Sequence, residues 1–119
     1  MAQGSVEKSH WPEKLSIKDG VDIQFIKVAD IQWIDAAGDY MCIQATGKTH
    51  IMRITMKELA DLLDPSKFLR IHRSTIVNAS RIVAAQTLTN GEYLLTLDCD
   101  SQLKVSRSYR DKVQHLFTS

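Results

Sequence analysis

Short runs of alternating apolar and polar residues, separated by turn signals, constrain this chain more than any other feature. Val21, Ile23 and Phe25 alternate with polar residues directly after Asp19-Gly20, a pair that suits a tight hairpin turn. Further runs of this kind cover 31–35, 40–45 and 48–54, and turn residues at 36–39 and 46–47 separate them. No strand–helix–strand rhythm and no internal repeat interrupts the series, so the pattern predicts antiparallel β-structure.

The second half of the chain continues the same pattern. Residues 82–88 and 92–98 flank Asn90-Gly91, which predicts a hairpin with a type I′ turn. Leu103 and Val105, with polar neighbours, predict one last short strand. The apolar pair Ile76-Val77 is expected to re-enter the sheet just after a basic segment.

Two short helices are expected between these strands. Thr55 and Glu58 have the spacing of a capping box, in which each side chain bonds to a backbone N–H at the helix start. Behind them, four apolar residues at helical spacing form one face: Met56, Leu59, Ala60 and Leu63. The second helix is predicted over 108–117, with an apolar stripe of Tyr109, Val113, Leu116 and Phe117.

These elements fit one domain that is mostly β, a compact set of small antiparallel β-sheets with two short helices. At 119 residues the chain is long enough to bury a modest core. Residues 1–13 are expected to be a flexible or expression-derived lead-in, and residues 14–119 the domain. No apolar run approaches the length of a membrane span. Cys42 and Cys99 have no paired-cysteine context, which favours buried free thiols.

Motifs that carry catalysis are missing from the sequence. There is no glycine-rich phosphate loop, no Gly-x-Ser-x-Gly and no His-Glu-x-x-His. The histidines at 10, 50, 72 and 115 do not have metal-ligand spacing. Asp35 and Asp39 flank a turn and are expected to bond their own backbone rather than to act as a catalytic pair. We therefore expect no enzyme activity, no metal and no cofactor.

The charge of the chain is distributed unevenly. Residues 1–66 hold 7 Lys and Arg against 10 Asp and Glu, a balance of −3, whereas residues 67–119 hold 8 against 4, a balance of +4. Two basic clusters, 70–73 and 104–110, lie in the positive half. A charge run is often only a solvated face, but two clusters on a small β scaffold also suit phosphate and base recognition.

The residue types in these clusters are compatible with DNA contact, and two other interpretations remain open: Arg73 as part of a surface ion pair and Arg107 as an ordinary helix-start residue. An arginine fork matches guanine O6 and N7 or a phosphate, and a histidine donates or accepts at a base edge. His72 and Arg73 precede the apolar pair, so they are expected to project from a loop or strand edge. Arg107 lies where the last strand gives way to the second helix, whose first N–H groups are free to hold a phosphate.

Four segments in this order and spacing resemble the LytTR (LytR/AlgR-type) DNA-binding domain. The likeness runs from about residue 14 to residue 117. The segments are Ile31-x-Trp33-Ile34-Asp35-Ala36-x-Gly38-Asp39-Tyr40, Met56-Lys57-Glu58-Leu59, Phe68-x-Arg70-Ile71-His72-Arg73-Ser74-x-Ile76-Val77-Asn78, and Val105-Ser106-Arg107-Ser108-Tyr109.

The resemblance implies a domain that binds double-stranded DNA through loops rather than through a recognition helix. Carried over by position, the base contacts fall on His72, Arg73, Arg107 and Met41, the last through an apolar contact such as a thymine methyl. The phosphate or supporting contacts fall on Asp39, Tyr40, Lys48, Arg70, Asn78, Lys104, Ser106, Ser108 and Arg110.

The resemblance also implies a biological setting: the output domain of a bacterial, cytoplasmic response regulator of a two-component system, acting in transcription regulation. We expect direct-repeat promoter sites, no membrane contact and an isolated domain that is monomeric off DNA. Such proteins commonly carry an N-terminal receiver domain, and none is present in this sequence. A receiver or sensor part is therefore expected elsewhere.

Other classes of function are compatible with the same sequence. A small β protein-interaction module would act through exposed strand edges instead of arginines. A single-strand nucleic-acid binder would need exposed aromatic side chains for stacking, but only 7% of the residues are aromatic and Tyr40 is the one candidate. An enzyme is the least supported alternative.

Overall fold

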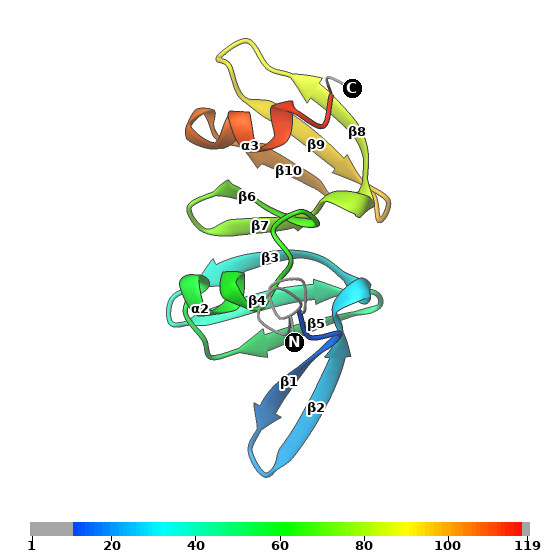
Figure 1. Cartoon of the computed structure of the whole chain (residues 1–119), viewed down its shortest axis with the longest axis vertical. Helices are drawn as coiled ribbons and strands as arrows, with labels where there is room; N and C mark the ends of the chain where they lie inside the picture. Colours follow the sequence, from blue (N-terminus) through cyan, green and yellow to red (C-terminus); the bar gives the residue numbers. More distant parts are fainter. Residues whose placement is uncertain (1–10, 118–119) are drawn as a thin grey trace, which may run out of the picture.

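Three antiparallel sheets follow one another along the molecule in a computed structural model that describes residues 11–117 (Figure 1). At one end, β1 (Lys14–Asp19) and β2 (Asp22–Lys27) form a separate hairpin. The central sheet has the order β5-β4-β3-β7-β6. At the other end lies a three-stranded sheet of the order β10-β9-β8. The predicted mostly β architecture of small antiparallel sheets is confirmed.

The bounds of the remaining elements follow the chain closely. The central sheet contains β3 (Ile31–Ala37), β4 (Tyr40–Ala45), β5 (Lys48–Met52), β6 (Phe68–His72) and β7 (Thr75–Asn78). The third sheet contains β8 (Ile82–Thr87), β9 (Tyr93–Leu97) and β10 (Gln102–Val105). The helices are α2 (Met56–Asp61) and α3 (Arg110–Gln114), with 3-10 turns η1 (Val28–Asp30), η2 (Ala79–Arg81) and η3 (Arg107–Tyr109).

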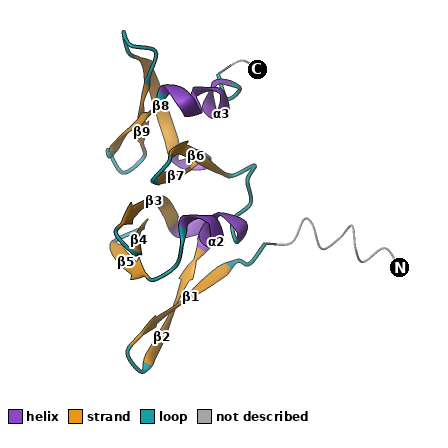
Figure 2. Ribbon diagram, turned by 90° about the vertical axis from the view of Figure 1, so that its left-hand side faces the viewer, coloured by secondary structure: helices purple, strands orange, loops and turns teal. Residues whose placement is uncertain are grey.

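The central sheet contributes to two hydrophobic cores, one on each face, because successive side chains of a strand point to opposite sides. Ile34 and Ile43 are paired across β3 and β4 and are fully buried against α2 and the inner side of the β1–β2 hairpin. Trp33 and Val77, also paired, pack with the third sheet and Val113 of α3. Figure 2 shows α2 and α3 beside different parts of the stack.

The capping box predicted for the first helix is present. The Thr55 hydroxyl accepts a hydrogen bond from the Glu58 N–H at 3.0 Å, and the Thr55 N–H donates to Glu58 Oε1 at 3.1 Å. These bonds satisfy backbone groups that a helix start leaves unpaired. Leu59 lies fully buried behind the cap, as the apolar spacing predicts.

Several sequence-based predictions are wrong in detail. The second helix is shorter than 108–117: it opens as η3, and Leu116 and Phe117 of its expected apolar stripe are 40% and 43% exposed. The Asn90-Gly91 turn is not type I′, because Asn90 lacks the positive φ that this turn needs at both central residues. Instead, the Leu88 N–H donates to Glu92 O at 2.8 Å, and this hydrogen bond closes a turn of three residues. Of these three residues, only Gly91 is in the left-handed region, with a φ of 84°.

The two cysteines are free, but neither is buried as expected. Cys42 is half-buried on β4, and Cys99 is exposed in the β9–β10 turn. The predicted lead-in lies largely outside the described residues, which begin at Trp11. The first strand, β1, begins at Lys14, where the domain is expected to begin.

Candidate nucleic-acid interface

Three turns leave the sheets at the same end of the strands. Because β3 pairs antiparallel with both β4 and β7, the Gly38-Asp39 turn lies beside the Arg73-Ser74 turn between β6 and β7. The Ala36 N–H donates to Ser74 O at 2.8 Å and joins the two. The third turn joins through the Ser106 N–H, which donates to Ile71 O at 3.1 Å. We call residues 38–40, 72–74 and 106–108 the loop edge, which follows the left-hand side of Figure 1.

Arg70 holds the β6–β7 turn in shape. Its Nε donates to His72 O at 3.1 Å, and its Nη2 donates to Arg73 O. Its guanidinium also lies 5.9 Å from the centre of the Tyr109 ring, which belongs to η3. Arg70 is half-buried, and its guanidinium contacts both the β6–β7 turn and η3. It is therefore a positioning residue that joins two parts of the loop edge.

The imidazole of His72 has a defined tautomer. The Ser74 N–H donates to His72 Nδ1 at 3.2 Å, and a backbone N–H can only donate. His72 Nδ1 therefore accepts, and the Ser74 hydroxyl at 2.9 Å can donate to the same atom. In the neutral ring the proton then sits on Nε2, which is left as a hydrogen-bond donor. Such a donor suits an acceptor on a base edge or a phosphate.

Arg73 and Arg107 are the two exposed arginines of the loop edge. In the part of the chain that the structure describes, neither forms an ion pair with a carboxylate. The Arg107 side chain packs against the β8–β9 turn: a Cβ added at Gly91 would lie 3.2 Å from Arg107 Cδ. Arg107 is therefore supported by a turn that only a glycine fits without strain.

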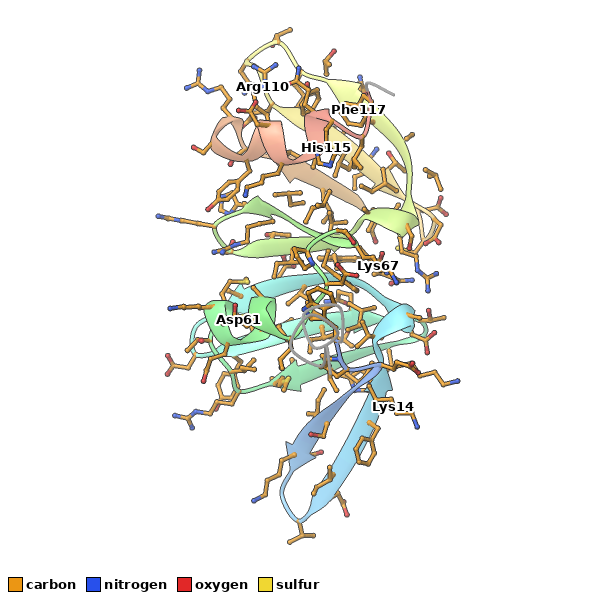
Figure 3. All side chains as sticks on the ribbon, in the orientation of Figure 1. Lys14, Asp61, Lys67, Arg110, His115 and Phe117 are labelled. Carbon is orange, nitrogen blue, oxygen red and sulfur yellow. The ribbon has the colours of Figure 1, made fainter. Side chains whose placement is uncertain are left out.

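Two further basic residues, Lys104 and Arg110, lie three residues before and three residues after Arg107. Arg110, labelled in Figure 3 near the β8–β9 turn, lies with its guanidinium 5.6 Å from the centre of the Tyr93 ring. Lys104 is 61% exposed, and its Nζ lies 3.8 Å from Glu92 Oε1. At this exposure the ion pair holds Lys104 only weakly, so its ammonium is available to another anion.

Met41 does not lie where a base contact requires. Its side chain is only 4% exposed and belongs to the core that α2 covers. It alternates inward with Ile43 and Ala45 along β4, whereas Tyr40 before it is 44% exposed. The expectation of an apolar base contact by Met41 is therefore wrong, because the pleat of β4 points this side chain into the protein.

Asn78 and Lys48, both expected as phosphate or supporting residues, are not placed to contact DNA at the loop edge. Asn78 is 4% exposed: its amide donates to Ile31 O at 2.8 Å, and its Oδ1 accepts from the Ser80 N–H at 3.1 Å. Asn78 therefore supports the fold from inside and does not reach the surface. Lys48 begins β5 opposite Ala45, at the other end of the central sheet from Asp39. Lys48 is thus exposed but outside the loop edge.

Arg53 was not singled out from the sequence, yet it lies next to the loop edge. It directly follows β5, whose last residue Met52 pairs with Met41, and its guanidinium lies 5.9 Å from the centre of the Tyr40 ring. The antiparallel order of β3, β4 and β5 was the available signal, since it returns the end of β5 to the end of β3.

Other kinds of site find little support in the described residues. Across 11–117, no group of three His, Cys, Asp or Glu side chains is placed to hold a metal ion. Asp35 serves the fold instead of chemistry: it accepts from Trp33 Nε1 and from the Thr75 hydroxyl, both at 3.1 Å. Within the same range, no helix is long and apolar enough to cross a membrane.

The sequence of the chain is similar to a known domain family and to known regulatory proteins. The family model of the LytTr DNA-binding domain matches residues 22–118. A response regulatory protein of Vibrio cholerae is 33% identical over 107 residues, which are 87% of this chain and 39% of that protein. The transcriptional regulatory protein YpdB of Escherichia coli is 32% identical over 82 residues, 68% of this chain and 34% of that protein. The chain thus spans well under half the length of these relatives.

A solved structure shows the same fold. The LytTr DNA-binding domain of a methyl-accepting/DNA response regulator from Bacillus cereus superimposes with a TM-score of 0.80. The match covers 89% of this chain and 97% of that chain at 24% sequence identity. The arrangement of three small sheets described above is therefore shared with a known domain.

Proposed function

The chain belongs to the LytTR family of DNA-binding domains, and we propose that it reads double-stranded DNA through the loop edge rather than through a helix. One observation carries the proposal: three turns far apart in the sequence meet at one end of the sheets and bring His72, Arg73 and Arg107 together. The helices are poor candidates, since α2 has six residues and α3 five.

The loop-edge residues divide into two roles. His72, Arg73 and Arg107 contact base edges, because they are polar, supported at their backbones and free of internal ion pairs among the described residues. Lys104 and Arg110 contact phosphates, with the Ser106 and Ser108 hydroxyls and the Asp39-Tyr40 turn alongside. Phosphate contacts fix the register of a protein on DNA, and base contacts select the sequence.

The proposed setting follows from the relatives, whose names describe response regulators and transcriptional regulators. The domain acts in the bacterial cytoplasm as the DNA-binding output of such a regulator. It binds direct-repeat promoter sites, the signal reaches it from a receiver or sensor part, and the isolated domain is monomeric off DNA. No cofactor or catalytic step is involved.

Selection of bound duplexes from a random DNA library at fixed salt tests this proposal. The wild-type domain is expected to enrich one motif. Arg107→Ala and Arg73→Ala should each blur the motif at one position and cost about 1–3 kcal/mol on the selected site if the arginine fork is bidentate to guanine. Equal weakening on selected and random duplexes would reassign that arginine to a phosphate.

Lys48→Ala is the matched control, because it removes an exposed positive charge from the opposite end of the same sheet. We expect it to leave the motif unchanged. A salt titration should give a slope of about 0.9 per phosphate neutralised, reduced by about one unit in Lys104→Ala. An affinity independent of salt would refute the electrostatic part of the proposal.

A further inference from the structure

The β1–β2 hairpin exposes an apolar row that the loop edge does not use. Val21 is 97% exposed, Ile23 59% and Phe25 67%. The hairpin is a sheet of its own and projects from the end of the molecule opposite the three-stranded sheet (Figures 1 and 2). Single exposed apolar residues are ordinary, but a continuous row on a projecting element marks an interaction surface.

The register of the hairpin determines what surrounds this row. Ser16 pairs with Phe25, Lys18 with Ile23, and Lys14 with Lys27, so these six side chains share one face. The alternate residues Leu15, Ile17 and Ile26 are buried against the domain. We call Lys14, Ser16, Lys18, Ile23, Phe25 and Lys27, together with Val21 at the tip, the hairpin face.

All the charges of the hairpin face are positive. Lys14, Lys18 and Lys27 are exposed around the apolar row, and no carboxylate shares the paired positions of this face. Three lysines around an apolar row form an amphipathic surface that complements apolar side chains flanked by carboxylates. We propose that the hairpin face binds an acidic, amphipathic segment of a protein.

Other occupants fit the same face less well. A second copy would oppose its own three lysines across the apolar contact, which is a repulsive arrangement. An anionic membrane would reach the tip of the hairpin, where the Asp19 and Asp22 carboxylates flank Val21, whereas a peptide that lies across Ile23 and Phe25 does not have to contact the tip. DNA phosphates would satisfy the lysines but leave Ile23 and Phe25 uncovered. An acidic, apolar protein segment satisfies both the lysines and the apolar row.

Two helical peptides of equal length provide the probe. They share one leucine stripe and carry either glutamate or lysine on the polar face. Titrated into the isotope-labelled domain, the glutamate peptide should bind and shift the backbone amide resonances of residues 14–27, while the lysine peptide should not bind. Phe25→Ser should weaken this binding by about tenfold. The phenyl ring is largely exposed in the free domain and would be covered by the leucine stripe of the peptide, and the serine loses this apolar contact. Lys18→Glu should also weaken it.

Val83→Ser is the matched control: Val83 is 64% exposed on β8, outside the hairpin face, and its substitution should change nothing. Because Phe25 is exposed, Phe25→Ser should keep the urea midpoint and the DNA affinity of the wild type. The proposal fails if neither peptide binds or both bind equally. It also fails if the hairpin face binds phosphatidylglycerol vesicles in preference to the glutamate peptide, or if Phe25→Ser abolishes a dimer of the wild type in sedimentation. A loss of DNA affinity in Phe25→Ser would assign the face to DNA and not to a protein.

Discussion

Arg70→Lys separates the positioning role of this arginine from a role as a phosphate contact. The substitution keeps the positive charge but removes the planar fork that reaches both His72 O and Arg73 O. It also removes the guanidinium that lies over the Tyr109 ring. If Arg70 shapes the β6–β7 turn, the charge alone cannot replace it.

The size of the effect follows from the interactions that a lysine cannot make. A hydrogen bond from a charged donor contributes about 1.5–3 kcal/mol when buried, and Arg70 is only half-buried. A lysine still reaches one carbonyl, so about 1–2 kcal/mol of unfolding free energy should be lost, including about 0.5–1 kcal/mol from the aromatic contact. The loosened turn should lower the preference for the selected duplex over random DNA by about tenfold.

Urea unfolding and competition binding at constant salt measure the two effects. Arg53→Lys is the matched control: this exposed arginine also lies 5.9 Å from a tyrosine ring, but the described structure gives it no carbonyl acceptor. We expect wild-type specificity in the control and a loss of no more than about 0.5–1 kcal/mol of unfolding free energy, the part that comes from the aromatic contact alone. If Arg70→Lys retains full specificity while Arg70→Ala weakens selected and random duplexes alike, Arg70 is a phosphate contact and the positioning argument is wrong.

Three more substitutions test separate parts of the structure. Gly91→Ala should destabilise the fold by about 1–2 kcal/mol in thermal melts, because the φ of Gly91 is 84°. It should also weaken DNA binding, because the added Cβ would displace the Arg107 side chain. Unchanged DNA binding would show that the packing of Arg107 against this turn does not contribute to binding. Asn78→Ala should cost about 1–3 kcal/mol in urea unfolding, since it leaves Ile31 O buried without its donor, and a smaller loss would mean that water replaces the amide. Hydrogen bonds from the Thr55 N–H and side chain lower the pKa of Glu58 below its usual 4.5, so its ionised form stabilises the fold above about pH 4.5 and this gain disappears as the pH falls through the lowered pKa. The stability difference between wild type and Glu58→Gln should shrink over that acid range, and a difference independent of pH would contradict the cap electrostatics.

Alternation of apolar and polar residues predicted strands such as β9, in which every second side chain is buried. β5 and β8 contain no buried residue, and the turn residues beside them were the signal that located them. β6 was not predicted as a strand, because Phe68, Leu69 and Ile71 are all buried and their spacing shows no strict alternation. Burial on both faces removes the signal on which the prediction depends.

The loop edge was predicted in part, and the errors have one geometric cause. Arg73 and Arg107 were found as basic residues next to structural boundaries, and both are exposed there. Met41 and Lys48 were assigned by position in the sequence without following the strands. The alternation of β4 places Met41 inward, and the antiparallel turn after β4 carries Lys48 to the far end. The same path brings Arg53 to Tyr40, which a one-dimensional pattern does not reveal.

The order of folding events determines when the loop edge can exist. Among the described strands, β3 and β7 form the one pairing that joins strands that are not neighbours in sequence, and the bond from Thr75 to Asp35 spans 40 residues. Closing so long a loop costs more conformational entropy than closing a local hairpin, so we infer that this pairing forms late. The turns at Asp39 and Arg73 come together only through it. A partial opening between β3 and β7 would therefore abolish the DNA recognition that we propose for the loop edge, while the hairpins on either side stay folded.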